Sequence, residues 1–151
     1  MRAWVGSCSS SPNLQGTRSG LPMATAWAVM QHLGVDGYVD LTRTTLANAD
    51  AMRAGIAAID GVQVLGDGTY HLIAMAAEDG ADPLDVFALG DALEAKGWFH
   101  DRQTPPDSLH STVSNTNTGV IEEYLDALAA TVAEIRGQRA KDRSTNYATL
   151  E

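Results

Sequence analysis

A five-residue polar segment near the N-terminus, Gly16-Thr17-Arg18-Ser19-Gly20, has the composition of an anion-binding turn. Its glycines let backbone N–H groups approach an anion closely, and its hydroxyl and guanidinium groups add hydrogen-bond donors. An apolar segment follows at once, so the turn would lie at a helix N-terminus, which favours a negative charge. The spacing matches neither GxxxxGK[ST] nor GxGxxG, so a simple helix cap and turn is the alternative interpretation.

A second group of polar side chains lies in the stretch GWFHDRQTPPDSLHSTVS. The candidate binding residues flank the Pro105-Pro106 turn, and they are His100, Asp101, Arg102, Gln103 and His110. Loops on a rigid scaffold often carry binding groups, but loops are also polar by default. Both interpretations of this stretch stay open.

The histidines and the cysteine do not form a metal-binding pattern. The four histidines, at positions 32, 71, 100 and 110, show neither HxxxH nor HExxH spacing. Cys8 is the single cysteine, which excludes an internal disulfide and a cysteine-based zinc site. We therefore expect no metal ion and a cytoplasmic location.

Length and charge limit the classes of function. The 151 residues are 44% hydrophobic and carry a formal net charge of −9, which suits one acidic domain with a real core. We expect no nucleic-acid partner, because binding phosphates needs clustered positive charge. We also expect no membrane span, because the uncharged stretch from Ser19 to Gln31 is shorter than the roughly 20 residues required.

The elements that would position these groups alternate helices with short strands. In the first half we expect a loop or interface segment over residues 1–17, an apolar helix from Leu21 to Leu33 ended by Gly34, a helix from about Asp36 to Ile59, and two β-like runs around Gly66-Asp67-Gly68. In the second half we expect a helix from Asp82-Pro83 to Lys96-Gly97, strands on either side of Pro105-Pro106, and a last helix from about Thr118 to Arg136.

This order mixes helices and antiparallel strands without regular βαβ alternation. It predicts an α+β fold, a small antiparallel sheet covered by helices on one face, over residues 18–136 with its leading helices. Residues 137–151 are polar, and we expect them to fray.

The helix around Trp27 has apolar residues nearly all round, including Met23 and Met30. Such a helix is typically buried on several sides, and so small a domain offers little room for it. Two interpretations are open. The helix is the central core helix of a monomer, or it packs against a partner outside this chain or a second copy.

Several stretches occur together in one order: SPNLQGTRSG, then AWAVMQHLGVDGYVDLTR, then DVFALGDALEAKGWFHDRQTPPDSLHSTVS. They resemble the C-terminal portion of group II pyridoxal-phosphate-dependent decarboxylases, most of all the sphingosine-1-phosphate lyase-like branch. The shared features are a glycine-hydroxyl-arginine turn, an apolar tryptophan helix, an HLGxxGY turn, a KGW strand and a QxP turn. The resemblance extends from about Pro12 to Ile135.

The resemblance implies a dimer of fold type I, in which a large domain binds pyridoxal phosphate. Gly16, Thr17 and Arg18 would then contact the cofactor phosphate from the other subunit, with Thr17 standing for the usual serine. Arg102, Gln103 and His110 would be candidates for substrate contact. The C-terminal domain of the family, an antiparallel sheet covered by helices, agrees with the fold expected from the residues.

One departure from the family is large. Its Schiff-base lysine follows a Ser/Thr/Asp-x-His stretch upstream of the turn, whereas the two lysines here, Lys96 and Lys141, lack that context. We therefore expect no catalytic residue in this chain. It would be the C-terminal part of a carbon–carbon lyase, an amino-acid decarboxylase or an aldehyde-lyase, inactive without the large domain. A non-catalytic metabolite-binding or oligomerisation module is the alternative.

Overall fold

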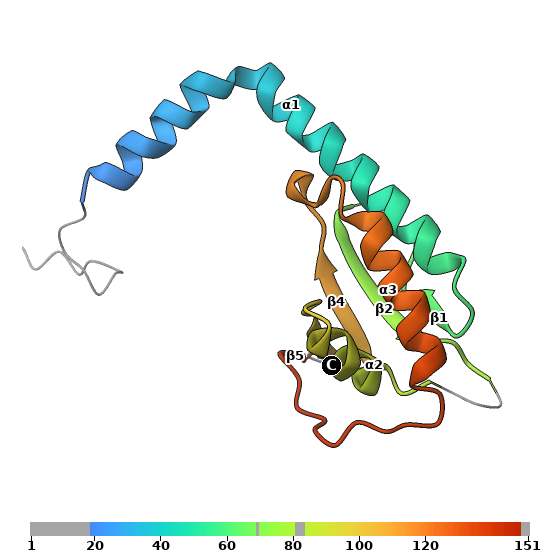
Figure 1. Cartoon of the computed structure of the whole chain (residues 1–151). Coiled ribbons are helices and arrows are strands. Elements are labelled where there is room, and N and C mark those ends of the chain that lie inside the picture. The colour runs from blue at the N-terminus through green and yellow to red at the C-terminus, as the bar shows by residue number, and fades with distance from the viewer. Residues whose placement is uncertain (1–18, 69, 81–83, 149–151) are drawn as a thin grey trace, which may run out of the picture. The chain divides into compact units, whose positions relative to one another are not determined.

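The computed structural model of the chain describes residues 19–68, 70–80 and 84–148. The chain divides into two units, residues 1–38 and 39–151. The described part of the first unit is the beginning of helix α1 (Leu21–Ala57), which continues into the second unit (Figure 1).

Gly34 separates α1 into two helical segments. Its φ of 61° and ψ of −175° are not helical, and glycine adopts such a conformation readily because it has no Cβ atom. The prediction of two helices that meet at Gly34 is confirmed. The second segment ends at Ala57, two residues before the expected end at Ile59.

The first segment of α1 exposes its apolar side chains. Met23 is 64% exposed, Trp27 is 62% exposed and Met30 is 50% exposed. A single helix cannot bury such side chains by itself, so the described residues of the first unit, 19–38, form no hydrophobic core of their own.

The second unit contains the rest of the secondary structure. After α1 come β1 (Val62–Val64), β2 (Leu72–Ala77), α2 (Val86–Ala95), β3 (Asp101–Thr104), β4 (Ser108–Thr112), a 3₁₀ turn (Asn115–Asn117), α3 (Ile121–Glu134) and β5 (Tyr147–Ala148). The strands form one sheet in the order β1-β2-β4-β3-β5. Neighbouring strands are antiparallel except for β3 and β5, which are parallel.

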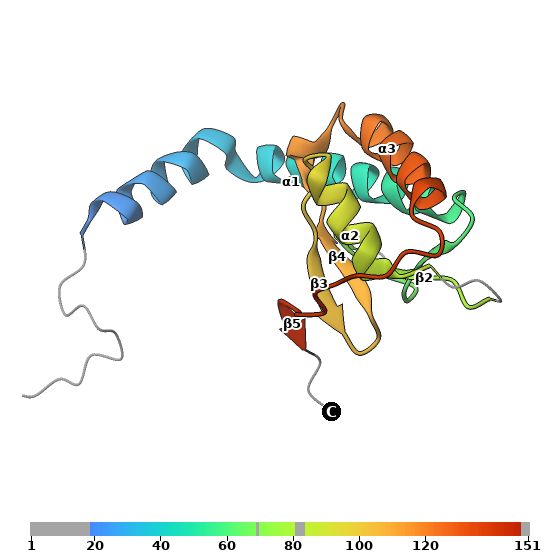
Figure 2. The same cartoon turned by 60° about the horizontal axis from the view of Figure 1, so that its bottom comes forward.

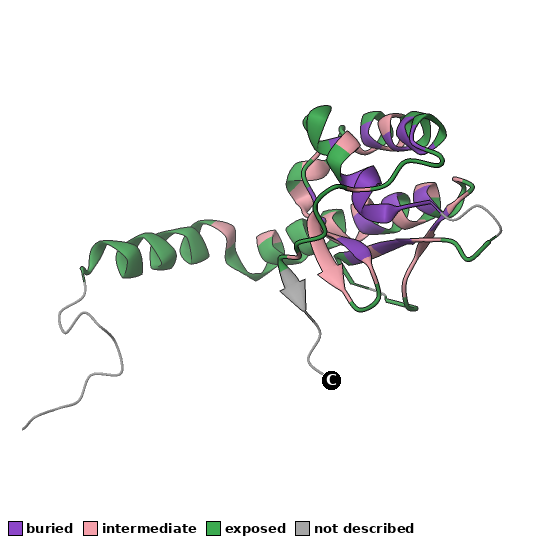
Figure 3. Cartoon of the chain, turned by 90° about the horizontal axis from the view of Figure 1, so that it is seen from below, coloured by how far each residue is buried: buried purple, intermediate pink, exposed green. Residues whose placement is uncertain are grey.

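Helices cover one face of this sheet. The C-terminal part of α1, α2 and α3 lie on the same side of the strands (Figure 2). The buried residues gather between these helices and the sheet (Figure 3), and their largest side chains include Ile56, Ile73, Phe87, Leu109 and Leu128. The predicted α+β fold, with helices on one face of a small antiparallel sheet, is confirmed.

Two glycines allow the layers to approach each other. A Cβ atom on Gly55 would lie 2.1 Å from a methyl group of Leu125, and one on Gly90 would lie 2.9 Å from a methyl group of Leu109. Both distances are shorter than van der Waals contact. Gly55 therefore lets α1 pack closely on α3, and Gly90 lets α2 pack closely on β4.

Helix α2 begins later than the sequence predicted. Asp85 is its N-cap, and the Asp85 carboxylate accepts hydrogen bonds from the backbone N–H groups of Phe87 and Ala88. The start expected at Asp82-Pro83 is therefore wrong, and those two residues lie outside the described part of the chain. The end at Lys96-Gly97 is as expected, with Gly97 at a φ of 93°.

The segment after α3 packs against the second unit. Ala140 packs partly buried on the hydrophobic core. Next to the β3–β5 pair, the Asn146 N–H donates to the Arg102 carbonyl, and Oδ1 of the Asn146 side chain accepts from the Arg102 N–H. Arg143 pairs with both Asp85 and Asp107. Long-range polar contacts therefore join residues 138–148 to the second unit, whereas the sequence predicted that the chain frays after Arg136.

The boundaries of the units also differ from the expected ones. The sequence predicted one domain over residues 18–136, whereas the structure places the helical segment up to Tyr38 in a unit of its own. The non-helical residue Gly34 lies shortly before the boundary between the two units.

Candidate functional site

The N-terminal turn is described only at its end. Gly16, Thr17 and Arg18, the predicted contacts of a cofactor phosphate, lie outside the described residues. The Ser19 hydroxyl accepts a hydrogen bond of 3.3 Å from the backbone N–H of Leu21, and the Gly20 carbonyl accepts one of 3.0 Å from Ala24. The described end of the turn therefore caps α1, and phosphate binding stays a prediction.

Arg102, a predicted substrate contact, is directed at the helix layer. Its guanidinium pairs with Asp91 of α2, donates a 2.8 Å hydrogen bond to the Asp142 carbonyl, and lies 5.4 Å from the centre of the Phe87 ring. The side chain is 13% exposed. These contacts give Arg102 a structural role in joining β3, α2 and the C-terminal segment.

Gln103 and His110, the other two predicted contacts, lie on the opposite face of the sheet. In the β3–β4 ladder Arg102 is opposite the core residue Leu109, whereas Gln103 is opposite Ser108 and Asp101 is opposite His110. Successive residues of a strand point to opposite faces, so the side chains of Gln103 and His110 share the face that Arg102 leaves. The three predicted residues do not converge on one site.

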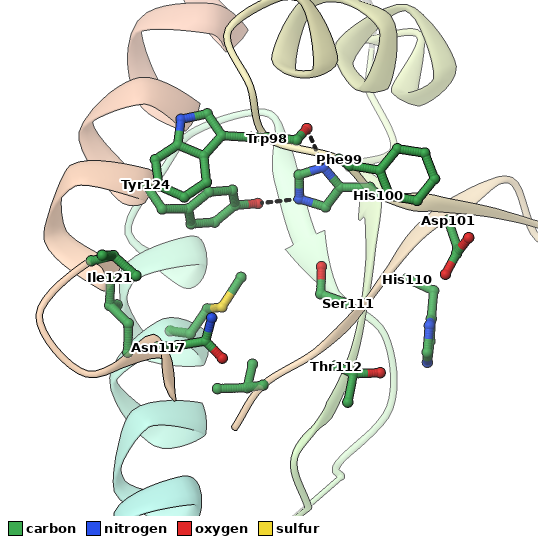
Figure 4. Close-up of a pocket in the computed structure, with 13 residues that line it drawn as sticks. Trp98, Phe99, His100, Asp101, His110, Ser111, Thr112, Asn117, Ile121 and Tyr124 are labelled. Atoms are coloured by element: carbon green, nitrogen blue, oxygen red, sulfur yellow. Dashed lines mark hydrogen bonds between the residues drawn. The ribbon is translucent and has the colours of Figure 1, made fainter. Parts of the chain in front are cut away.

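A cavity of about 290 Å³ lies in the second unit, at the end of the sheet where β3 begins and β4 ends. Its lining comes from the segment before β3, from β4, from the start of α3 and from Met52 of α1 (Figure 4). Of the residues singled out in the sequence, His100, Asp101 and His110 line this cavity, while Arg102 and Gln103 do not.

Three aromatic side chains form one wall of the cavity. The rings of Trp98 and Tyr124 meet edge to face, with centroids 5.3 Å apart and an angle of 71°. The Tyr124 hydroxyl lies 2.9 Å from Nε2 of His100, and Nδ1 of His100 lies 3.2 Å from the Trp98 carbonyl oxygen. Because a carbonyl only accepts, Nδ1 carries the proton, and Tyr124 donates to Nε2 of the neutral ring.

Burial sets the protonation of this wall. It lowers the pKa of His100, and the Trp98 carbonyl and the charge of Asp101 offset only part of that effect. Burial also raises the pKa of the Tyr124 hydroxyl. Both side chains are therefore neutral near pH 7, where they act as hydrogen-bonding groups rather than as charges.

Sequence reasoning missed Tyr124 as a member of this site. Its position in the apolar stripe of the last helix predicted a core residue, and it is indeed 5% exposed. The signal that distinguishes it is chemical, because a buried tyrosine hydroxyl needs a partner. The partner, His100, lies 24 residues earlier in the chain.

Residues 19–68, 70–80 and 84–148 offer neither a metal site nor a membrane-spanning helix. In this part of the chain no group of three or more His, Cys, Asp or Glu side chains could hold a metal ion. No helix within the same ranges has the length and apolar character needed to cross a membrane.

Comparison with known proteins gives a consistent result. No protein-family model matches the chain. The chain is 32% identical over 133 residues to a sphingosine-1-phosphate lyase of Oryza sativa subsp. japonica, and this match covers 88% of the chain. It covers 24% of the plant protein, so the chain spans about a quarter of the length of the curated relatives it matches.

Solved structures agree with this match. The sphingosine-1-phosphate lyase Bpss2021 of Burkholderia pseudomallei superposes with a TM-score of 0.74 at 31% identity, covering 88% of this chain and 30% of that one. A glutamate decarboxylase of Lactobacillus brevis superposes with a TM-score of 0.72 at 17% identity, covering 80% and 30%. The second match concerns the fold alone, which is that of the C-terminal domain of fold-type I pyridoxal-phosphate enzymes.

Proposed function

Because the chain is homologous to a segment of sphingosine-1-phosphate lyases, we propose that it is the C-terminal part of a pyridoxal-phosphate-dependent carbon–carbon lyase. The observation that carries this proposal is the 32% identity over 88% of the chain. Its substrate would be an amino acid that is decarboxylated or a phosphorylated amino alcohol that is cleaved to an aldehyde.

The described residues do not by themselves fit the cofactor. Lys96 donates hydrogen bonds of 2.9 Å to the Thr131 hydroxyl and 2.8 Å to Glu134, so its amine is held at the surface of α3. Lys141 lies on the C-terminal segment, without the sequence context of a cofactor lysine. We therefore propose that the covalent attachment of pyridoxal phosphate and the chemistry it supplies belong to a large domain outside this chain.

The proposed contribution of this chain is threefold. The second unit would be the small domain of the enzyme. The apolar first segment of α1 would pack on the large domain or on a dimer partner, which would cover Trp27 and its neighbours. Gly16, Thr17 and Arg18 would contact the cofactor phosphate across the dimer interface.

The test is reconstitution. The 151-residue chain mixed with pyridoxal phosphate should show no absorbance band of a lysine-linked cofactor, whereas co-expression with the upstream region of its gene should give that band and lyase turnover. In the reconstituted enzyme Arg18→Ala should weaken cofactor retention. Arg43→Ala, on the exposed surface of α1, is the matched control and should not.

The opposite results are as clear. A borohydride-reducible adduct on one lysine of the isolated chain, together with turnover, would contradict the proposal. If co-expression with the upstream region, tested at several lengths, never restored a cofactor band, the second candidate would be favoured, which is a non-catalytic binding or oligomerisation module. The cavity beside Tyr124 is the observation that favours that candidate.

A further inference from the structure

We infer that the cavity between β4, the start of α3 and the segment before β3 binds a small organic ammonium ion with an apolar body. Every residue that lines it belongs to the second unit. The inference goes beyond the proposed function, because it needs neither the cofactor nor a large domain.

The aromatic wall of the cavity is already formed. Trp98, His100 and Tyr124 hold one another by an edge-to-face contact and two hydrogen bonds, and Ser111 faces them across the open space (Figure 4). A preformed wall lowers the entropic cost of binding, since few side chains must be ordered when a ligand arrives.

The size and the floor of the cavity suit an apolar body. Met52, Val113 and Ile121 supply aliphatic surface beside the aromatic wall. The volume of about 290 Å³ is at the lower end of ordinary ligand cavities, which favours a compound of about ten non-hydrogen atoms.

The charge of the lining favours a cation. Asp101 is the one carboxylate among the lining residues, which include no lysine and no arginine. Its charge reaches the aromatic wall, since it acts to raise the pKa of His100. Phe99, which is 65% exposed, also lines the cavity, and an aromatic ring attracts an ammonium group.

The experiment compares three probes of nearly equal shape and different charge: 2-phenylethylammonium, neutral 2-phenylethanol and anionic phenylacetate. The readout is the indole N–H signal of Trp98 in NMR spectra of the full chain, assigned with the Trp4→Phe and Trp27→Phe variants. His110, which lies opposite Asp101 in the β3–β4 ladder, also lines the cavity, and the spectra are recorded at one pH for all three probes. The ammonium probe should shift the signal saturably, with a dissociation constant on the order of 1 mM for a ligand of this size.

Two variants distinguish a site from general adsorption. Asp101→Asn should weaken the ammonium probe about fivefold, as expected for the loss of one partly exposed charge pair. Asp126→Asn, on the exposed side of α3, removes the same charge from the chain and should leave binding unchanged. Ser111→Leu fills the cavity and should abolish the shift, while the dispersion of the remaining signals reports that each variant is folded.

Several outcomes would overturn the inference. These are a neutral alcohol that binds as tightly as the ammonium, equal binding by the parent and Asp101→Asn, or a shift that does not saturate. Because the probes act on the chain alone, such a result leaves the reconstitution test of the lyase untouched.

Discussion

The two units use similar apolar residues with opposite results. In the first, Met23 and Trp27 are more than 60% exposed, whereas in the second Phe87, Leu89 and Leu93 are at most 1% exposed. The difference lies in what is available to cover them. Helix α2 has β4 beneath it and α3 beside it, while the first segment of α1 is the only described element of its unit.

This comparison explains why composition alone misleads about stability. The apolar residues of the second unit contribute free energy of folding because folding removes them from water. Those around Trp27 contribute little within their own unit. They form an exposed apolar surface, and large surfaces of this kind generally favour association with another molecule.

The largest expected effect comes from truncating one aromatic residue in each unit. Phe87→Ala should lower the free energy of unfolding by about 3–5 kcal/mol, because it opens a cavity in the core and removes the ring that the guanidinium groups of Arg102 and Arg143 both contact. Trp27→Ala should change it by no more than about 0.5 kcal/mol. Urea unfolding followed by circular dichroism measures both changes. Equal losses of stability would contradict the claim that only the apolar residues of the second unit stabilise the fold.

The next effect concerns the contact between α2 and the C-terminal segment. Asp85 is buried and accepts hydrogen bonds from Phe87, Ala88, Ala140 and Arg143. Asp85→Ala should cost about 2–3 kcal/mol, since it removes a helix cap and leaves buried donors without an acceptor. Asp126→Ala, which changes an exposed aspartate of α3, is the control and should be nearly neutral.

Asp85 also gives this contact a pH dependence. Burial alone would raise the pKa of Asp85, but the N–H groups of Ala140, Ala88 and Phe87 and the charge of Arg143 outweigh it and lower the pKa below 3.8. The stabilisation is therefore complete above about pH 4 and is lost as the pH falls through the lowered pKa. Urea unfolding of the parent chain at a series of pH values should show the free energy of unfolding falling at acid pH. The part of this fall that is due to Asp85 should be missing in Asp85→Ala.

The misplaced start of α2 shows what a local pattern can and cannot predict. Asp82 followed by Pro83 has ideal capping chemistry, and Asp85 has equally good chemistry three residues later. Asp85 is selected by contacts with residues 55 and 58 positions further along the chain. By contrast, β1 and β2 pair antiparallel on either side of Gly66-Asp67-Gly68, as the local turn signal predicted.

The same distinction holds for the candidate site. Residue types and spacing placed His100 among the polar candidates, and its neighbour Trp98 in a strand-like run. The contact between His100 and Tyr124 is tertiary and has no local signature. Arg102 was a candidate for substrate contact because it is a polar residue beside a turn; its guanidinium pairs with Asp91 and the C-terminal segment, and substrate contact stays a prediction.

A smaller effect tests the cavity wall against an exposed tyrosine. Tyr124→Phe should lower the free energy of unfolding by about 1–2 kcal/mol, because Nε2 of the buried His100 loses its donor. Tyr70→Phe, at a position 70% exposed, should be neutral. Thermal and urea unfolding of the two variants side by side give the difference, and a neutral Tyr124→Phe would argue that water already reaches His100.

The smallest expected effect compares two cationic side chains at the surface, Arg43 of α1 and Lys96 at the C-terminal end of α2. Arg43 pairs with Asp40 while both side chains are 73% exposed, so Arg43→Met should change the free energy of unfolding by at most about 0.3 kcal/mol. Lys96 also binds the buried Thr131 hydroxyl, and Lys96→Met should cost about 1 kcal/mol. Raising the salt concentration should weaken the contribution of the Lys96–Glu134 ion pair to stability, but not the contribution of the hydrogen bond to Thr131. If salt removed the whole effect, Lys96 would be an ordinary surface charge, and its bond to Thr131 would no longer argue against a cofactor role for its amine.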